Sequence, residues 1–249
     1  MSFEERIRNA SQTNKSRIVL ALDLEDPSPE RLAGRSKEIL EKVSPFVCAV
    51  KLNRQLVLSL GLRNGVDSIV DLAHQLLLPT IMDAKLNDVG HTNEFMTRTY
   101  ADIGFDAIIA SPVVGWDDGL EPVFRVANSR GMAVILLVYM SNPGAEMFYS
   151  LMAAQGREPA RPVFEQLTEL AVQWKAHGAI VGATKPEVIK RVRQLAGDKL
   201  RIYSPGIGAQ GGDAKRAWEA GADYLIVGRS ICQATNPAKA AEQLRNEAL

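Results

Sequence analysis

Residues 80–88 read Thr-Ile-Met-Asp-Ala-Lys-Leu-Asn-Asp, a short apolar run that ends in alternating charge. Apolar runs of four to eight residues are typical of buried β-strands. We predict eight such strands, at residues 17–23, 46–51, 80–85, 107–111, 132–140, 179–182, 201–204 and 224–227. Segments of helical period lie between them. Apolar strands that alternate with helices predict a parallel sheet covered by helices.

The number of repeating units favours a closed barrel over an open sheet. Eight strand–helix units follow one another over roughly 230 residues without a linker, and a (β/α)₈ barrel takes roughly 250 residues. A doubly wound open sheet is the competing α/β architecture. We therefore predict one domain over residues 1–249, a (β/α)₈ TIM barrel. Residues 1–16 are expected to form an N-terminal arm or a short helix outside the core.

Composition excludes several classes of function. Lys plus Arg and Asp plus Glu number 29 each, so no net field attracts nucleic acid or an anionic membrane. The apolar run 133–140 is too short to cross a bilayer, and the charged N-terminus lacks the apolar core of a signal peptide. Two cysteines predict no disulfide framework, and three scattered histidines predict no zinc site. These features indicate a cytoplasmic protein.

Three consecutive predicted strands end in charged residues. Asp23 closes the first, Lys51 the second, and Asp83 and Lys85 the third. Residues two apart share one face of a strand, so Asp83 and Lys85 should point the same way. Since neighbouring strands end at the same mouth of a barrel, we expect all four groups to converge there. Buried charges are costly unless they are paired, so the array is either functional or a structural ion-pair network.

Two glycine-rich segments near the C-terminus predict an anion site. Residues 204–213 follow the seventh strand and read Ser-Pro-Gly-Ile-Gly-Ala-Gln-Gly-Gly-Asp, and Gly228-Arg229-Ser230 follow the eighth. Loops at these positions of a barrel commonly hold phosphate. The segment also fits the G-x-G-x-x-G fingerprint of dinucleotide-binding folds, but that fingerprint belongs after a first strand, so we reject it here. Asp213 is expected to cap the next helix.

These motifs together resemble the orotidine 5′-phosphate decarboxylase suprafamily. Asp83, Lys85 and Asp88 form the D-x-K-x-x-D motif of that suprafamily. The glutamine-bearing glycine loop is more specific: it resembles the decarboxylases, whereas the related sugar-phosphate enzymes of the suprafamily generally lack it. The similarity extends from about residue 17 to residue 237. It implies a decarboxylase that acts on orotidine 5′-monophosphate in pyrimidine synthesis, without metal or other cofactor.

The resemblance also implies a role for each site residue. Lys85 is expected to stabilise and protonate the carbanion, with Asp83 beside the substrate carboxylate and Lys51 within the array. Asp88, the fourth residue of the catalytic set, should reach the site of a second subunit, as should Thr92, which implies a homodimer. The residues expected to bind substrate are Asp23, Lys51, Thr92, Ser141, Pro205, Gln210, Gly228 and Arg229.

Two other functions fit the same residues. The first is a magnesium-dependent decarboxylase or aldolase of the same suprafamily, acting on a sugar phosphate. The second is a non-catalytic dimer that binds nucleotides through the phosphate loops alone. The irregular segment 141–162 follows the fifth strand and should lie at the mouth of the barrel, but its role is not evident from the sequence.

Overall fold

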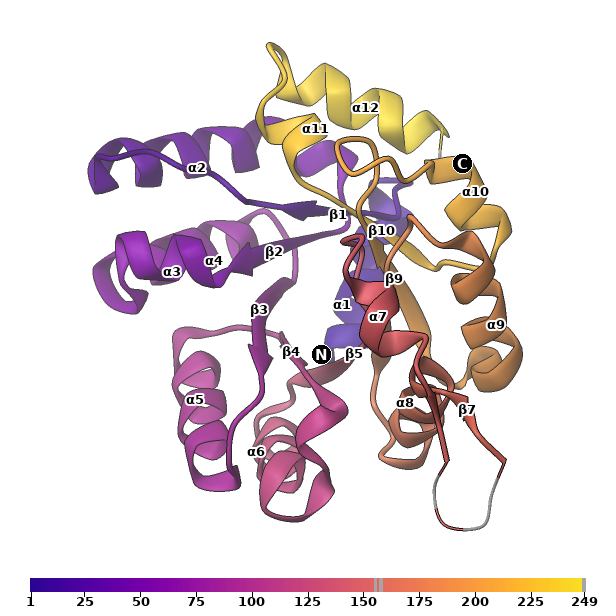
Figure 1. The fold of residues 1–249 in the computed structure, drawn as a ribbon. Coiled ribbons are helices and arrows are strands. Elements are labelled where there is room, and N and C mark those ends of the chain that lie inside the picture. Colours follow the sequence, from indigo (N-terminus) through magenta and orange to yellow (C-terminus); the bar gives the residue numbers. More distant parts are fainter. Residues whose placement is uncertain (155, 157–158, 248–249) are drawn as a thin grey trace.

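The computed structural model describes residues 1–154, 156 and 159–247. Within these residues, eight parallel strands close into a barrel in the order β1-β10-β9-β8-β5-β4-β3-β2 (Figure 1). The strands are β1 Ile18–Ala21, β2 Ala49–Asn53, β3 Thr80–Leu86, β4 Ala107–Ala110, β5 Ala133–Tyr139, β8 Gly178–Val181, β9 Arg201–Pro205 and β10 Tyr224–Val227. The predicted (β/α)₈ barrel is confirmed, and the open sheet is excluded because β1 pairs with both β2 and β10.

The helices are arranged about the strands (Figure 1). They are α1 Phe3–Thr13, α2 Pro29–Val43, α3 Arg54–Leu60, α4 Asp67–Gln75, α5 Gly90–Ile103, α6 Glu121–Arg130, α7 Ala145–Tyr149, α8 Val163–Gln173, α9 Pro186–Ala196, α10 Ala214–Glu219, α11 Arg229–Cys232 and α12 Pro237–Glu247. Most surround the barrel, while α1 lies behind it and α7 in front of it in the view of Figure 1. Five single turns are also present, η1 Ser44–Phe46, η2 Leu62–Val66, η3 Pro112–Val114, η4 Trp116–Leu120 and η5 Gly197–Lys199. No helix of the described residues is long and apolar enough to span a membrane.

Local sequence explains where the helices begin. Helix α2 starts at Pro29 because proline suits the first helical position, while the Ser28 hydroxyl accepts a hydrogen bond from the Arg31 amide. Asp213 caps α10 as predicted, accepting a hydrogen bond of 2.7 Å from the Arg216 amide. Cap residues of this kind satisfy backbone donors that a first helical turn leaves unpaired.

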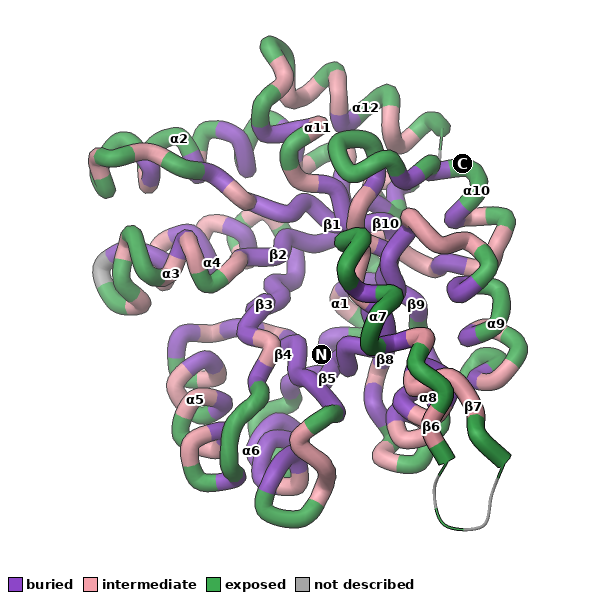
Figure 2. Tube along the Cα trace, viewed as in Figure 1, coloured by how far each residue is buried: buried purple, intermediate pink, exposed green. Residues whose placement is uncertain are grey.

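The core lies between the strands and the surrounding helices. Figure 2 shows buried strands at the centre and exposed residues on the outer faces of the helices. All seven residues of β5 are buried, as a strand covered on both faces requires. Helix α1 buries Phe3, Ile7 and Ala10 on one face, and its outer face is charged. Burial of this apolar surface is the main stabilising contribution to the fold.

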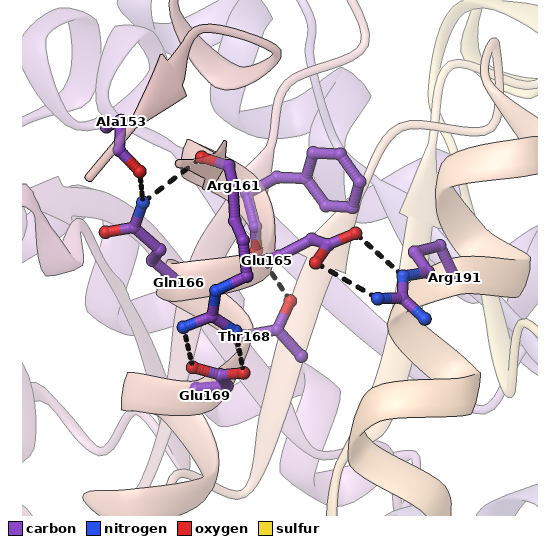
Figure 3. Close-up of polar contacts among 8 residues, drawn as sticks. Ala153, Arg161, Glu165, Gln166, Thr168, Glu169 and Arg191 are labelled. Atoms are coloured by element: carbon purple, nitrogen blue, oxygen red, sulfur yellow. Dashed lines mark hydrogen bonds and ion pairs between the residues drawn. The ribbon is translucent and has the colours of Figure 1, made fainter. Parts of the chain in front are cut away.

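The segment between β5 and α8 contains more structure than an irregular loop. It forms α7 and a two-stranded antiparallel ribbon, β6 Met152–Ala153 with β7 Arg161–Pro162. Figure 3 shows how this ribbon is attached: the Gln166 amide of α8 donates to the carbonyls of Ala153 at 2.7 Å and Arg161 at 3.2 Å. The Arg161 guanidinium also pairs with Glu169, on the next turn of α8. The ribbon is therefore held by α8, away from the barrel axis.

Candidate active site

A cavity of about 290 Å³ opens at the carboxyl ends of the strands. All the residues predicted for catalysis or substrate binding, apart from Asp88 and Thr92, line this cavity. These are Asp23, Lys51, Asp83, Lys85, Ser141, Pro205, Gln210, Gly228 and Arg229. They come from β1, β2, β3, β5, β9, β10 and the loops that follow these strands. The carboxyl end is the face on which barrel enzymes carry their sites.

The four charged groups meet in a chain of alternating sign. Lys51 Nζ donates to Asp83 Oδ2 at 2.9 Å and lies 3.8 Å from Asp23 Oδ1. Lys85 Nζ donates to the other oxygen of the Asp83 carboxylate at 2.6 Å. Lys51 and Asp83 are 4% and 6% exposed, so their ion pair is largely shielded from water. The predicted convergence is confirmed.

The chain of charges keeps Lys51 and Asp83 ionised. Burial by itself would lower the pKa of Lys51, but the carboxylates of Asp83 and Asp23 outweigh it and hold that pKa above its usual value. Burial would likewise raise the pKa of Asp83, but the ammonium groups of Lys51 and Lys85 hold it below the usual value. Fixed charges are thus present in a site of low polarity, where they act strongly on a reacting group.

Lys51 does not end its strand, contrary to the prediction. Strand β2 runs from Ala49 to Asn53, with Lys51 at its centre, paired in register with Ile81. The predicted strand ended at Lys51 because lysine is rare in the interior of a buried strand. The Asp83 carboxylate on the neighbouring strand offsets that cost, an interaction that local sequence does not reveal.

The backbone at Lys85 is unusual for a strand. Its φ is +45°, in the left-handed region that residues with a Cβ seldom adopt. The register between β3 and β4 shifts between Met82 and Leu86, which indicates a bulge. The direction of the Lys85 side chain therefore depends on this bulge, and not on regular alternation along the strand. Strain of this kind costs about 1–3 kcal/mol and is concentrated at functional sites.

Two polar groups at the cavity make no hydrogen bond to another described residue. Asp23 Oδ1 is buried without a hydrogen bond, its nearest cation being Lys51 at 3.8 Å. Buried acceptors are normally satisfied, so this oxygen is an exception, while the Asp23 side chain as a whole is 30% exposed at the cavity. Arg229 is exposed at the cavity mouth, and no ion pair joins it to another described residue. The cavity thus offers an acceptor near its floor and a cation at its rim.

The loop after β9 is tightly folded on itself. Gly206, Gly208 and Gly211 all have positive φ, at +101°, +69° and +86°. The Gly208 amide donates to the Gly212 carbonyl at 2.8 Å, and the Gly212 amide donates to the Gly206 carbonyl at 3.0 Å. A Cβ on Gly206 would lie 3.0 Å from Ser141 Cβ, so only glycine allows this loop to pass Ser141 closely.

Asp88 and Thr92 lie outside this cavity, as the resemblance implied. Asp88 is exposed in the turn between β3 and α5, and its carboxylate accepts a hydrogen bond of 2.7 Å from the Val89 amide. Thr92 is half-buried in the first turn of α5. Two large apolar residues nearby in the sequence are also exposed to solvent: Val89 is 53% exposed and Phe95 is 71% exposed. None of the described cationic side chains forms an ion pair with the Asp88 carboxylate.

Sequence reasoning missed the remaining lining of the cavity. Asn53 projects into it two residues beyond Lys51 on the same strand. Alternation would have identified Asn53 had the strand been extended past the lysine. The apolar floor was also missed, since its side chains have no chemistry that distinguishes them from the core. Its main members are Ile109, Leu137, Ile180 and Ile226.

A second cavity of about 450 Å³ is larger but lies at the opposite end of the barrel. Arg8 of α1, Arg201 and Tyr224 are among its lining residues. That end of a barrel serves stability, so size does not make this cavity the better candidate. Within the described part of the chain, no three His, Cys, Asp or Glu side chains are grouped to hold a metal ion.

Comparisons with known proteins agree on one family. Residues 16–244 match the family described as "Orotidine 5'-phosphate decarboxylase / HUMPS family". The orotidine 5′-phosphate decarboxylase of Pyrococcus abyssi is 38% identical over 230 residues, covering 92% of this chain and 98% of that protein. That of Thermococcus kodakarensis is 37% identical over 235 residues, covering 94% of this chain and 98% of the relative.

Solved structures agree with the sequence comparisons. The Methanocaldococcus jannaschii decarboxylase, complexed with inhibitor BMP, has a TM-score of 0.80 and 30% identity, covering 94% of this chain and 98% of that one. The UMP synthase of Leishmania donovani has a TM-score of 0.87 at 27% identity, and all of this chain matches 56% of that longer protein. The chain therefore belongs to the orotidine 5′-phosphate decarboxylase / HUMPS family.

Proposed function

We propose that this protein converts orotidine 5′-monophosphate to uridine 5′-monophosphate and carbon dioxide, a step of pyrimidine biosynthesis. The observation that carries the proposal is the buried chain of Asp23, Lys51, Asp83 and Lys85 at the carboxyl ends of the strands. Relatives that share more than a third of its residues are named for this activity.

The reaction requires a charge where electrons accumulate. The bond between ring carbon C6 and the carboxylate breaks, carbon dioxide leaves, and the electron pair stays on C6. An ammonium group near that carbon stabilises the pair and then transfers a proton to it. Lys85 fills this role, because Asp83 holds its ammonium at 2.6 Å and its side chain, 26% exposed, lines the cavity. Lysine gives up a proton readily, whereas arginine effectively cannot.

The other charged residues hold Lys85 in place and bind the sugar. Asp83 receives one ammonium on each oxygen, so its carboxylate cannot rotate without breaking a buried ion pair. The Asp23 side chain is 30% exposed at the cavity, and its carboxylate accepts a hydrogen bond from a ribose hydroxyl, with Lys51 beside it. Substrate therefore adds a hydrogen bond to the array of charges.

The phosphate occupies the rim of the cavity. Arg229 presents a guanidinium fork there, and a Cβ on the neighbouring Gly228 would lie 3.3 Å from Asp23 Oδ2, so glycine leaves room beside that carboxylate. Gln210 and Pro205 line the same side, from the glycine loop. Binding energy from the distant phosphate lowers the barrier when it closes the loop over the reacting ring. Ser141, across from Gly206, contacts the pyrimidine edge.

The active unit is a homodimer whose sites are shared. The exposed Asp88 carboxylate has no cation from its own barrel, and the exposed Val89 and Phe95 beside it form an apolar surface suited to a second copy. In this arrangement Asp88 and Thr92 enter the partner's cavity. Asp88 then adds a carboxylate to the chain of charges around Lys85.

Release of carbon dioxide from orotidine 5′-monophosphate tests the proposed reaction. Full activity in excess chelator is expected, and loss of activity that magnesium restores would favour the metal-dependent sugar-phosphate enzyme of the same family. Binding of uridine 5′-monophosphate without any turnover of the orotate nucleotide would favour a non-catalytic binding protein. The variant Lys85→Arg is the matched control, because it keeps the positive charge but cannot readily transfer a proton.

Mixed dimers test the shared site. Lys85→Ala and Asp88→Ala are each expected to be inactive alone. After subunits exchange in a 1:1 mixture, half of the dimers pair unlike chains, and each of these carries one intact site. About one quarter of native activity should return. No recovery, once exchange has been verified with labelled subunits, would contradict a shared site.

A further inference from the structure

A single buried amide joins the turn that carries Asp88 to the neighbouring loop of the barrel. Asn93 lies in the first turn of α5 and is 0% exposed. Its Nδ2 donates to the Asp88 carbonyl at 2.6 Å and to the Gly119 carbonyl at 3.0 Å. Gly119 belongs to η4, which follows β4. One side chain therefore bridges the β3–α5 turn and the segment that follows β4.

The chemistry of the bridge requires an asparagine. The atom that faces two carbonyl oxygens must donate twice, and among neutral side chains of this length only a primary amide does so. The other end of the same amide, Oδ1, is buried without a hydrogen bond. A buried acceptor without a partner lowers stability. The unpaired Oδ1 of Asn93 therefore lowers stability, while Nδ2 of the same side chain holds the Asp88 and Gly119 carbonyls in place.

The surrounding backbone is equally close-packed. A Cβ on Gly90 would lie 2.7 Å from Asp118 Oδ1 and 3.0 Å from the Asp118 carbonyl carbon, so the turn rests directly on η4. A Cβ on Gly119 would lie 2.8 Å from the Val114 carbonyl oxygen. Glycine at position 90 lets the two segments approach until Asn93 can reach across them, and glycine at position 119 lets η4 pack against the preceding turn, η3. The Asp88 side chain, by contrast, is exposed and is held only by the Val89 amide.

We propose that Asn93 is a positioning residue for the Asp88 carboxylate, and that it acts on the active site of the partner subunit. This inference rests on the proposed function, in which Asp88 enters the neighbouring cavity. By fixing the Asp88 carbonyl, Asn93 limits the directions in which the exposed carboxylate can point. A misplacement of about 1 Å in a catalytic group costs on the order of 100-fold in rate. Asn93→Ala is therefore expected to lower kcat by 10- to 100-fold.

Mixed dimers distinguish this role from a general loss of structure. Mixed with Lys85→Ala, Asn93→Ala protein should recover activity to about one quarter of native, because one site then combines Lys85 from one chain with a braced Asp88 from the other. Mixed with Asp88→Ala, it should recover none, because both defects lie on the same contributed turn. A role within its own barrel predicts the reverse pattern. That reverse pattern, or equal recovery in both mixtures, would overturn the proposal.

Three controls keep the outcome interpretable. Thr97→Val removes a buried hydroxyl of the same helix, which donates only to the Asn93 carbonyl at 2.7 Å, and should leave kcat within twofold of native. If Asn93→Ala fails to fold, Asn93→Ser replaces it, since a single neutral hydroxyl has one proton and cannot donate to both carbonyls. The mixture of Lys85→Ala with Asp88→Ala must itself recover activity. If it does not, the shared site fails, and the inference on Asn93 is rejected with it, whereas turnover by the native protein still establishes the reaction.

Discussion

Replacement of Lys51 by methionine should weaken the fold as well as the site. Methionine has a similar length but no charge, so Lys51→Met removes an ammonium from between two carboxylates while keeping most of the packing. The side chain is 5% exposed and lies 2.9 Å from Asp83 and 3.8 Å from Asp23. After the change, Asp83 remains buried, and Lys85 is its one remaining ion-pair partner among the described residues.

The expected cost follows from that geometry. Removing one partner of a buried ion pair costs about 3–5 kcal/mol, because an uncompensated charge remains. Asp83 keeps Lys85 at 2.6 Å, so the low end of the range applies, about 3 kcal/mol. A chain of this size has an unfolding entropy of about 0.5 kcal/mol per kelvin, so Tm should fall by about 6 °C.

The pH dependence has a definite sign. The pKa of Asp83 is lowered in the folded protein, so its pairing adds stability above the unfolded pKa of about 3.9, and that stability is lost as pH falls through the folded value. The pKa of Lys51 is raised, so its contribution is present below about pH 10.4 and is lost as pH rises through the folded value. The difference between native and Lys51→Met protein should be constant near neutral pH and should shrink in acid.

Denaturant unfolding at one fixed protein concentration measures the effect, since a dimer's stability depends on concentration. Lys42→Met is the matched control: Lys42 lies 2.6 Å from Glu38, but both side chains are more than half exposed. Such surface pairs contribute about 0–1 kcal/mol. The double variant Lys51→Met with Asp83→Asn should cost less than the sum of the two single changes. If Lys51→Met lowers the free energy of unfolding no more than Lys42→Met does, the buried ion pairs do not contribute the stability assigned to them.

Three further changes test separate parts of the site. Lys85→Gly should be about 1 kcal/mol more stable than Lys85→Ala in thermal unfolding, because φ at this position is +45°; equal stability would argue against backbone strain. Arg229→Ala should raise KM by about 10- to 100-fold at unchanged Tm, since its guanidinium is exposed and binds phosphate; an unchanged KM would remove it from the phosphate site. Gly206→Ala should slow turnover, because a Cβ at φ +101° meets Gln210 at 2.9 Å and Ser141 at 3.0 Å; native kinetics would show that the loop tolerates both contacts.

The barrel could be predicted because its signals are local. Each strand is a short apolar run, and proline or a capping residue marks helix starts such as Pro29 in α2 and Ala214 in α10. Short helices carry weaker signals. Helix α3, Arg54–Leu60, has no side-chain cap, and α11, Arg229–Cys232, is a single turn within the expected phosphate loop.

The site could be predicted only as far as sequence motifs extend. Alternation placed Asp83 and Lys85 on one face, but the bulge and the positive φ that deliver Lys85 depend on pairing with β4. Asn93 contacts Gly119, which lies 26 positions away in the sequence, so no local sequence pattern indicates this bridge. Likewise, the unpaired oxygen of Asp23 becomes apparent only when its neighbours are placed in space.

The central claim is that the ammonium of Lys85 supplies both the field and the proton for decarboxylation. Single-turnover release of carbon dioxide from orotidine 5′-monophosphate by Lys85→Ala, with the Kd of uridine 5′-monophosphate measured on the same sample, tests it most directly. Release should slow by about 10⁴-fold or more while the Kd changes only a few-fold. Turnover within tenfold of native at an unchanged Kd would contradict the claim.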